Sequence, residues 1–241
     1  MSDTPALPPP LDDQAFDRAL IAAVFRLAAV DGWRNVRIAA AAREASLPLA
    51  RARLRFPTRG VVLVRFGRMA DAAALAEPAA ERPGEESVRD RLFGMLMRRL
   101  DLLQAHRDGV IALLRSLPFR PKTALFLGLL TERSMRWMLD ASGVSTTGLA
   151  GRLRVRGLVG VWLWALRAWA RDGTPDLGPT MAALDTALAR AERSAGWLAF
   201  CPFGGAKPAS EPPAPEPLAE EGPGAGESAA PKPANGPPPA S

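Results

Sequence analysis

Residues 36–56, VRIAAAAREASLPLARARLRF, contain two short helical stretches separated by a turn. The run of alanines favours a helix, because alanine has the highest intrinsic helix propensity. Pro48 is well placed to open the second helix, since proline fits the first helical turn. The small side chains of Ala42 and Ala45 suit close packing between the two helices. This spacing predicts a helix-turn-helix with Ser46 at its tight turn.

Helical patterns flank this motif on both sides. Apolar residues at 3.6-residue spacing predict a helix over 16–29, and Gly32 is expected to end it. Phe56-Pro57 ends the last helix of the motif, after which Thr58 is expected to cap a fourth helix that reaches about residue 75. Residues 15–76 are therefore predicted to form one helix-turn-helix domain.

The rest of the chain is predicted to hold five more helices between segments of low complexity. We expect a disordered arm over 1–14, a linker over 77–86 (EPAAERPGEE) and a disordered Pro/Ala/Gly/Glu tail over 201–241. A larger helical domain is predicted over 87–200. Its expected helices are one capped by Ser87 and others over 106–117, 121–141, 146–171 and 177–198. The predicted fold class is all-α, with about nine helices.

Composition restricts the class of protein. The chain has 241 residues, and its 48% hydrophobic content is enough for a core. One cysteine, Cys201, and one histidine, His106, cannot build a Cys/His zinc site within one chain. The N-terminus lacks a signal-peptide pattern, and the charge-free apolar stretches fall short of the roughly 18 residues that span a bilayer. We expect a cytoplasmic protein without stable membrane insertion.

No motif indicates catalysis. His106 and Asp108 are two residues apart, a spacing that points them to different sides of a helix. The sequence has no P-loop, dinucleotide fingerprint or nucleophile elbow. We therefore expect a protein that is not an enzyme and has neither a cofactor nor a metal site.

Positive charge is concentrated around the helix-turn-helix. Residues 16–70 hold eleven arginines and three acidic residues, whereas the whole chain has a net charge of only +6. Such a local surplus indicates binding to a polyanion. A GC-rich genome that favours arginine is the alternative explanation, but the rest of the chain does not share the excess.

Six arginines of this region are candidates for contacts with double-stranded DNA. Arg51 and Arg55 are one helical turn apart and share a face, so we expect them to reach base edges or phosphates. Arg53 points about 200° away and is expected to contact the DNA backbone at the flank. Each could equally be a solvated surface arginine. The remaining candidates lie near helix ends, where phosphate contacts are expected: Arg34, Arg37 and Arg59.

At motif level, residues 16–70 resemble the TetR family of transcriptional regulators. The resemblance rests on the order of a glycine–aromatic pair, a small-residue turn, a phenylalanine and a basic residue, here Gly32-Trp33, Ala45-Ser46-Leu47-Pro48, Phe56 and Arg59. Three positions differ from the family pattern: Arg37 replaces a threonine cap, Ser46 the turn glycine and Arg53 a tyrosine that contacts DNA. The resemblance implies a dimeric, ligand-responsive repressor that binds a palindromic site.

The same segment resembles, about as closely, the TetR-like ubiquinone-biosynthesis accessory lipid-binding proteins. Asp31-Gly32-Trp33 and Arg55-Phe56-Pro57 carry this second resemblance, which extends weakly into the Trp-rich stretch 162–172. It implies lipid presentation with a vestigial helix-turn-helix. The arginines favour DNA, because the lipid-binding alternative gives them no specific role beyond attraction to anionic lipid surfaces.

The larger domain is expected to pair subunits and to hold a lipophilic small molecule. Flexible apolar side chains are candidates for the lining of its pocket, with an ordinary core as the alternative: Met95, Phe126, Met135, Met138 and Trp162. The TetR resemblance implies that the helices over 146–171 and 177–198 form a four-helix bundle with their partners. Trp162 and Trp169 share a face and are expected to anchor that seam, with close helix approach at Gly151, Gly157 and Gly160.

Overall fold

The structure is a computed structural model that describes residues 12–76 and 87–200, with side chains up to residue 194. Within these ranges all regular secondary structure is helical, which confirms the all-α class and the prediction of about nine helices. The helices are α1 (Asp13–Asp31), α2 (Ile38–Glu44), α3 (Leu49–Arg55), α4 (Arg59–Leu75), α5 (Val88–Gln104), α6 (Arg107–Ser116), the 3-10 turn η1 (Leu117–Phe119), α7 (Pro121–Ala141), α8 (Gly148–Trp169) and α9 (Gly178–Phe200). The expected linker and tail, and residues 1–11 of the expected arm, lie outside the described residues.

The first helix begins earlier than predicted. Asp12 caps it by accepting a hydrogen bond from the backbone N–H of Ala15 at 2.6 Å, so α1 starts at Asp13 rather than at Phe16. An acidic side chain in the first turn also interacts favourably with the helix dipole. Residues 12–14 therefore belong to the first helix and its cap, and the prediction that placed them in a disordered arm is wrong.

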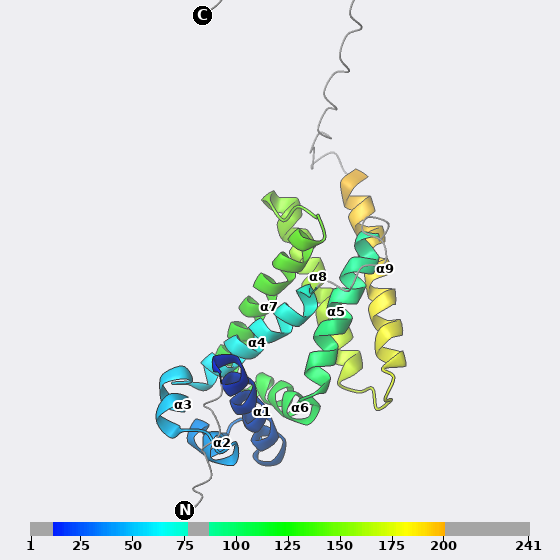
Figure 1. The fold of residues 1–241 in the computed structure, drawn as a ribbon. Coiled ribbons are helices and arrows are strands. Elements are labelled where there is room, and N and C mark those ends of the chain that lie inside the picture. Colours follow the sequence, from blue (N-terminus) through cyan, green and yellow to red (C-terminus); the bar gives the residue numbers. More distant parts are fainter. Residues whose placement is uncertain (1–11, 77–86, 201–241) are drawn as a thin grey trace, which may run out of the picture. The chain divides into compact units, whose positions relative to one another are not determined.

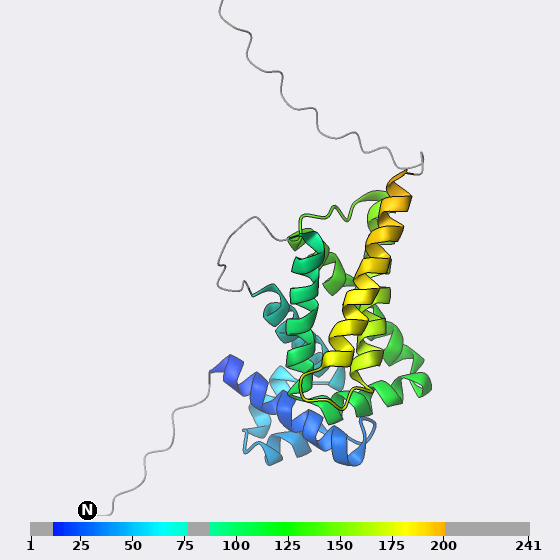
Figure 2. The same ribbon diagram turned by 90° about the vertical axis from the view of Figure 1, so that its right-hand side faces the viewer.

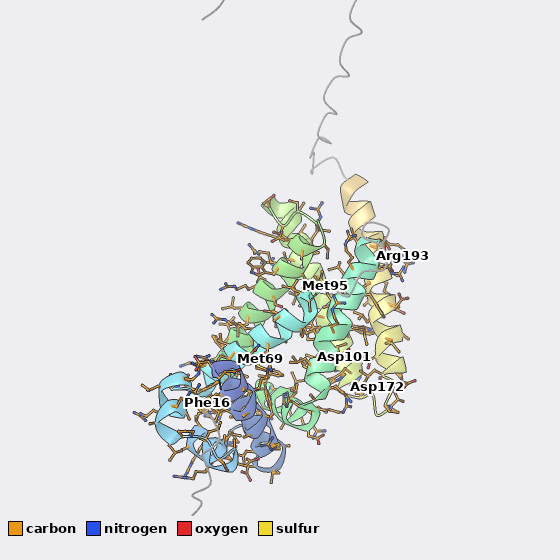
Figure 3. The ribbon with its side chains drawn as sticks, viewed as in Figure 1. Phe16, Met69, Met95, Asp101, Asp172 and Arg193 are labelled. Atoms are coloured by element: carbon orange, nitrogen blue, oxygen red, sulfur yellow. The ribbon has the colours of Figure 1, made fainter. Side chains whose placement is uncertain are left out.

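Helices α1 to α4 share a core of aromatic and aliphatic side chains. Phe16, Phe25, Phe56 and Phe66 are buried in it, and Figure 3 shows Phe16 on α1 where this helix meets α3. Ser46 has a φ of 54°, the left-handed conformation that most residues avoid. The chain does turn sharply between α2 and α3 at the position predicted from the sequence.

Helices α5 to α9 form a second group, and α4 leads into it from the first (Figure 1). α8 packs along α9, and α5 lies against both α4 and α9 (Figure 2). Ser87 caps α5 as expected, since its hydroxyl accepts a hydrogen bond from the N–H of Asp90 at 3.1 Å. None of the described helices is both long and apolar enough to cross a bilayer.

A buried acidic residue fixes the turn between α8 and α9. Asp172 accepts hydrogen bonds from the hydroxyl and N–H of both Thr174 and Thr180 at 2.6–3.0 Å, and it is labelled at this turn in Figure 3. The hydrogen bonds from Thr174 and then those from Thr180 lower the pKa of Asp172 far below its ordinary value, against the effect of burial. The last two helices are thus connected in a defined geometry.

The two helical groups also meet where α6 crosses α1. Gly109 of α6 lies against the backbone of α1, because a Cβ atom at this position would be only 2.2 Å from the carbonyl oxygen of Phe25. Next to this crossing, the His106 ring stacks on Phe25 at 5.5 Å and meets Phe66 edge-on at 5.6 Å. Burial, followed by the nearby charge of Arg26, lowers the pKa of His106. The histidine therefore serves packing between the groups, as a predominantly neutral ring at pH 7.

Candidate nucleic-acid interface

Helix α3 is attached to α1 by a network of ion pairs. Arg55 binds Asp17 through two hydrogen bonds of 2.8 and 2.9 Å and also contacts Asp13 at 2.6 Å. Arg51 binds Asp13 at 2.7 Å, and Arg65 of α4 binds Asp17 at 2.5 Å. The hydrogen bond from Arg51 lowers the pKa of Asp13, and the one to Asp17 raises the pKa of Arg55. The acidic residues of α1 therefore hold the short α3 in place.

This network conflicts with the roles expected for the arginines of α3. Arg51 and Arg55 do share a face, but that face packs against α1, and only 21% of the Arg55 side chain is exposed. Arg51 also lies over the Phe16 ring at 4.4 Å. Arg53, which was expected at the flank, is exposed on the other side of the helix. The structure thus turns Arg53, rather than Arg51 and Arg55, toward solvent.

The solvent-facing side of α3 is mostly small or apolar. Leu49, Ala50, Arg53 and Leu54 are exposed, and Leu54 retains 83% of its accessible surface. On the opposite side Ala52 is buried. An exposed leucine on a seven-residue helix has no packing role in the protomer, so this face is available to a partner. We call these four exposed residues the α3 face.

A basic groove lies beside α3, between the start of α2 and the start of α4. It has a volume of about 730 Å³. Arg59 supports it by donating hydrogen bonds to the carbonyl oxygens of Trp33 at 3.0 Å and Arg34 at 2.7 Å. Thr58 precedes α4 without a capping hydrogen bond from its side chain. We call this the first groove; it is lined by Arg34, Asn35, Val36, Arg37, Ile38, Pro57, Thr58 and Arg59.

The first groove carries uncompensated positive charge. Three of its residues are arginines and none is acidic. Neither Arg34, Arg37 nor Arg59 forms an ion pair with a carboxylate in the described ranges, whereas Arg26 is paired with Glu44 at 2.8 Å. The structure therefore brings together the three arginines that the sequence placed near helix ends, and it separates them from the paired arginines 51 and 55.

The candidate pocket residues divide into a buried set and an exposed one. Met95, Met135, Met138 and Trp162 are at most 9% exposed and belong to the core of the second helical group (Figure 3 labels Met95). Phe126 is 37% exposed and lies elsewhere, in a groove beside α4. The structure therefore does not bring all five side chains into one pocket. Their role in ligand binding stays a prediction.

Sequence reasoning missed a buried arginine within that core. Arg99 of α5 is 7% exposed, donates a hydrogen bond to Asp71 of α4 and another to Ser134 Oγ at 2.7 Å, and lies over the Trp162 ring at 5.1 Å. Its Nε has no hydrogen-bond partner among the described atoms, and burial lowers the pKa of Arg99. The spacing of Arg99 from Met95 and Leu103 on one helical face could have revealed it.

The expected subunit seam needs two corrections. Trp162 and Trp169 are 4% and 0% exposed inside the protomer, so they cannot form an external seam, whereas Leu163 and Trp164 are 55% and 53% exposed on α8. Gly151 serves the turn before α8, since a Cβ there would lie 2.1 Å from the backbone of Thr146. The exposed α8 surface therefore presents Leu163 and Trp164.

Comparison with solved structures identifies the fold. A TetR transcriptional regulator from Nitrosomonas europaea ATCC 19718 aligns at a TM-score of 0.62 and 21% identity, over 74% of this chain and 98% of its own. Regulators from Rhodococcus sp. RHA1 (TM-score 0.51, 19% identity, 76% and 97% covered) and Streptomyces coelicolor (0.55, 18%, 78% and 85%) align similarly. No family model and no curated protein matches the sequence. The chain has the fold of the TetR transcriptional regulators, which confirms the resemblance at the level of fold.

Proposed function

We propose that the protein is a dimeric, ligand-responsive transcriptional regulator of the TetR type that binds double-stranded DNA. The observation that carries the proposal is the first groove, where three arginines without acidic partners adjoin a helix-turn-helix. Unpaired cations favour phosphate binding, since an arginine already held by a carboxylate has less charge to offer. The likeness to regulators named as TetR proteins supports the same function.

In this proposal α3 enters the major groove and the first groove receives the sugar–phosphate backbone. Arg53 is the side chain of the α3 face able to donate hydrogen bonds to a guanine edge. Leu49, Ala50 and Leu54 are placed to make apolar contacts with thymine methyl groups. Arg34, Arg37 and Arg59 then fix the register of the protein on the duplex without selecting a sequence.

Dimerisation is proposed through α8 and α9. The exposed side chains of Leu163 and Trp164 on α8 and of Met181 on α9 supply an apolar surface, which Gly157 and Gly160 leave unobstructed. A two-fold dimer would space two α3 helices about 34–36 Å apart on one face of DNA and would require a palindromic site.

Ligand response is proposed to act through α4. This helix starts at the first groove and carries Asp71, which is bound to the buried Arg99 of α5. A ligand that displaced Arg99 would change the position of α4 and shift the population of dimers that fit the operator. An operator affinity that no core ligand alters would contradict this part of the proposal.

The test is selection of genomic DNA fragments by the full-length protein, followed by affinity measurements over a range of salt concentrations. Wild type should enrich a palindrome. Arg34→Ala/Arg37→Ala should weaken binding of all sequences and reduce the slope of log affinity against log salt by about 2. Arg53→Ala should instead relax selectivity at defined positions, at a cost of about 1–3 kcal/mol. Arg133→Ala/Arg136→Ala, a pair of exposed arginines on α7, is the charge-matched control.

Absence of an enriched site, with weak binding that fades as salt rises, would contradict the proposal. The lipid-binding alternative then makes its own prediction, a copurified isoprenoid lipid detectable by mass spectrometry. If Arg34→Ala/Arg37→Ala keeps both specific binding and the wild-type slope of log affinity against log salt, the phosphate contacts lie outside the first groove.

A further inference from the structure

A second groove lies on the other side of Arg59, between α4 and the start of α7. Its volume is about 550 Å³, within the range of small-molecule sites. It shares Thr58 and Arg59 with the first groove, and the two helices that form it lie side by side (Figure 1). The second groove is lined by Trp33, Thr58, Arg59, Gly60, Val61, Leu63, Val64, Arg120, Lys122, Thr123 and Phe126.

The charge of this groove is entirely positive. Arg59, Arg120 and Lys122 line it, no acidic residue does, and none of the three forms an ion pair with a carboxylate in the described part of the chain. The groove contrasts with the interior, where Arg99 is neutralised by Asp71. Three cations brought together without a counter-charge favour an anionic group, since each can supply a charge-assisted hydrogen bond.

The wall of the second groove is apolar. Val61 and Val64 of α4 are partly exposed and face the same groove as Phe126, which keeps 37% of its surface accessible at the start of α7. Trp33 and Leu63 complete this wall and are nearly buried. A phosphate group alone would leave the exposed apolar surface in water, and so would the DNA backbone. A ligand with an apolar body would cover it.

We propose that the second groove binds an amphipathic anion, a molecule with one acidic head group on an aliphatic body, and that its binding opposes DNA binding. The head group binds Arg120, Lys122 and Arg59, and the aliphatic body covers Phe126, Val61 and Val64. Arg59 belongs to both grooves, so an anion in the second competes for a cation that the first offers to DNA. The regulatory half of this inference rests on the proposed function; binding in the groove does not.

The experiment uses dodecyl phosphate as the probe, below its critical micelle concentration, with full-length protein and isothermal titration calorimetry in the absence of DNA. Dodecanoate tests a different acidic head group. Inorganic phosphate and dodecanol separate the contributions of the head group and the chain. Arg120→Ala/Lys122→Ala should weaken dodecyl phosphate binding by at least about tenfold. Arg133→Ala/Arg136→Ala, on α7 but outside the groove, should bind it like wild type.

Dodecyl phosphate should also lower the affinity for the enriched DNA site, and DNA should lower the affinity for dodecyl phosphate by the same factor, because coupling between two sites is reciprocal. Binding of the probe by a protein that enriches no DNA would contradict the proposed function while leaving the site intact. Equal affinity for DNA with and without the probe would overturn the regulatory half.

Other results would overturn the site itself. Unchanged probe binding by Arg120→Ala/Lys122→Ala would place the ligand elsewhere, and equally tight binding of inorganic phosphate would remove the amphipathic requirement. Binding to phosphatidylglycerol vesicles but not to the soluble probe would indicate a membrane surface. A last outcome is that wild type fails to bind the probe while Arg120→Ala/Lys122→Ala lowers the slope of log DNA affinity against log salt. That pair of results would make the second groove part of the surface that contacts DNA.

Discussion

Arginine side chains in this protein perform two different tasks, and neighbouring carboxylates decide which. On α3, Arg51 and Arg55 are held by Asp13 and Asp17 of α1, and their charge stabilises the protomer. Arg53 has no such partner in the described chain and faces solvent. Side chains only two residues apart therefore differ in function because α1 contributes acidic residues to one side of α3 and none to the other.

The most important of these carboxylates is Asp17, which is only 13% exposed and binds both Arg55 and Arg65. Asp17→Asn removes the charge and leaves two partly buried guanidinium groups poorly paired. We expect a loss of about 2 kcal/mol in the free energy of unfolding, measured by urea denaturation at pH 7. Asp31→Asn, at an exposed residue of the same helix, is the charge-matched control and should be nearly neutral. Equal effects of the two substitutions would mean that the network contributes nothing specific.

The sequence predicted part of this arrangement. One-turn spacing correctly placed Arg51 and Arg55 on a common face, because helical geometry is local. It could not reveal which way that face points, since the partner carboxylates lie 38 residues away in the chain. The prediction of a disordered arm over 1–14 also hid Asp13, which lies in α1. Helix ends marked by Gly32 and Ser87 were predictable, because their signals act on adjacent backbone groups.

At the scale of elements, the crossing of α6 over α1 fixes the first helical group against the second. Gly109 allows the contact because its missing Cβ leaves room for the carbonyl of Phe25. His106 and Phe66 pack next to it. No sequence pattern indicated this crossing, since a glycine within a helix has no periodic signature. Contact through a glycine makes the position sensitive to the smallest substitution.

Gly109→Ala should therefore destabilise the protein by about 2 kcal/mol, because the added methyl group would force α6 away from the backbone of α1. Gly128→Ala is the matched control, since a Cβ on this α7 glycine meets nothing within 4 Å. It should stabilise the protein by about 0.5 kcal/mol through higher helix propensity. Urea denaturation of both variants measures the difference. A Gly109→Ala protein as stable as wild type would show that the two helices are not in backbone contact.

At the scale of the whole molecule, two long helices of the second group carry exposed apolar side chains that a partner subunit could cover. One is α8, with Leu163 and Trp164, and the other is α7, whose exposed side chains include Leu125, Leu129 and Trp137. The proposed dimer covers the first. Tryptophan is among the residue types enriched at the energetic centres of protein interfaces.

Leu163→Glu/Trp164→Glu should therefore weaken dimerisation by at least about a hundredfold, since burying two carboxylates at the seam is unfavourable. Sedimentation equilibrium measures the effect, and circular dichroism should show an unchanged helical fold, because both side chains are exposed in the protomer. Leu125→Glu/Leu129→Glu is the control on α7. Dissociation by this control alone would place the subunit interface on α7 instead.

The contact between Gly109 and Phe25 also bears on how such a protein can diverge. At the crossing point it joins main chain to main chain, so no side-chain substitution elsewhere can bring the two helices closer than this contact. The interior around Arg99, in contrast, is packed through side chains, so substitutions there change the space enclosed by α5 to α9. Lineages that retain glycine at position 109 can therefore acquire new interior chemistry while α1, and the α3 helix bound to it, keep an inherited placement.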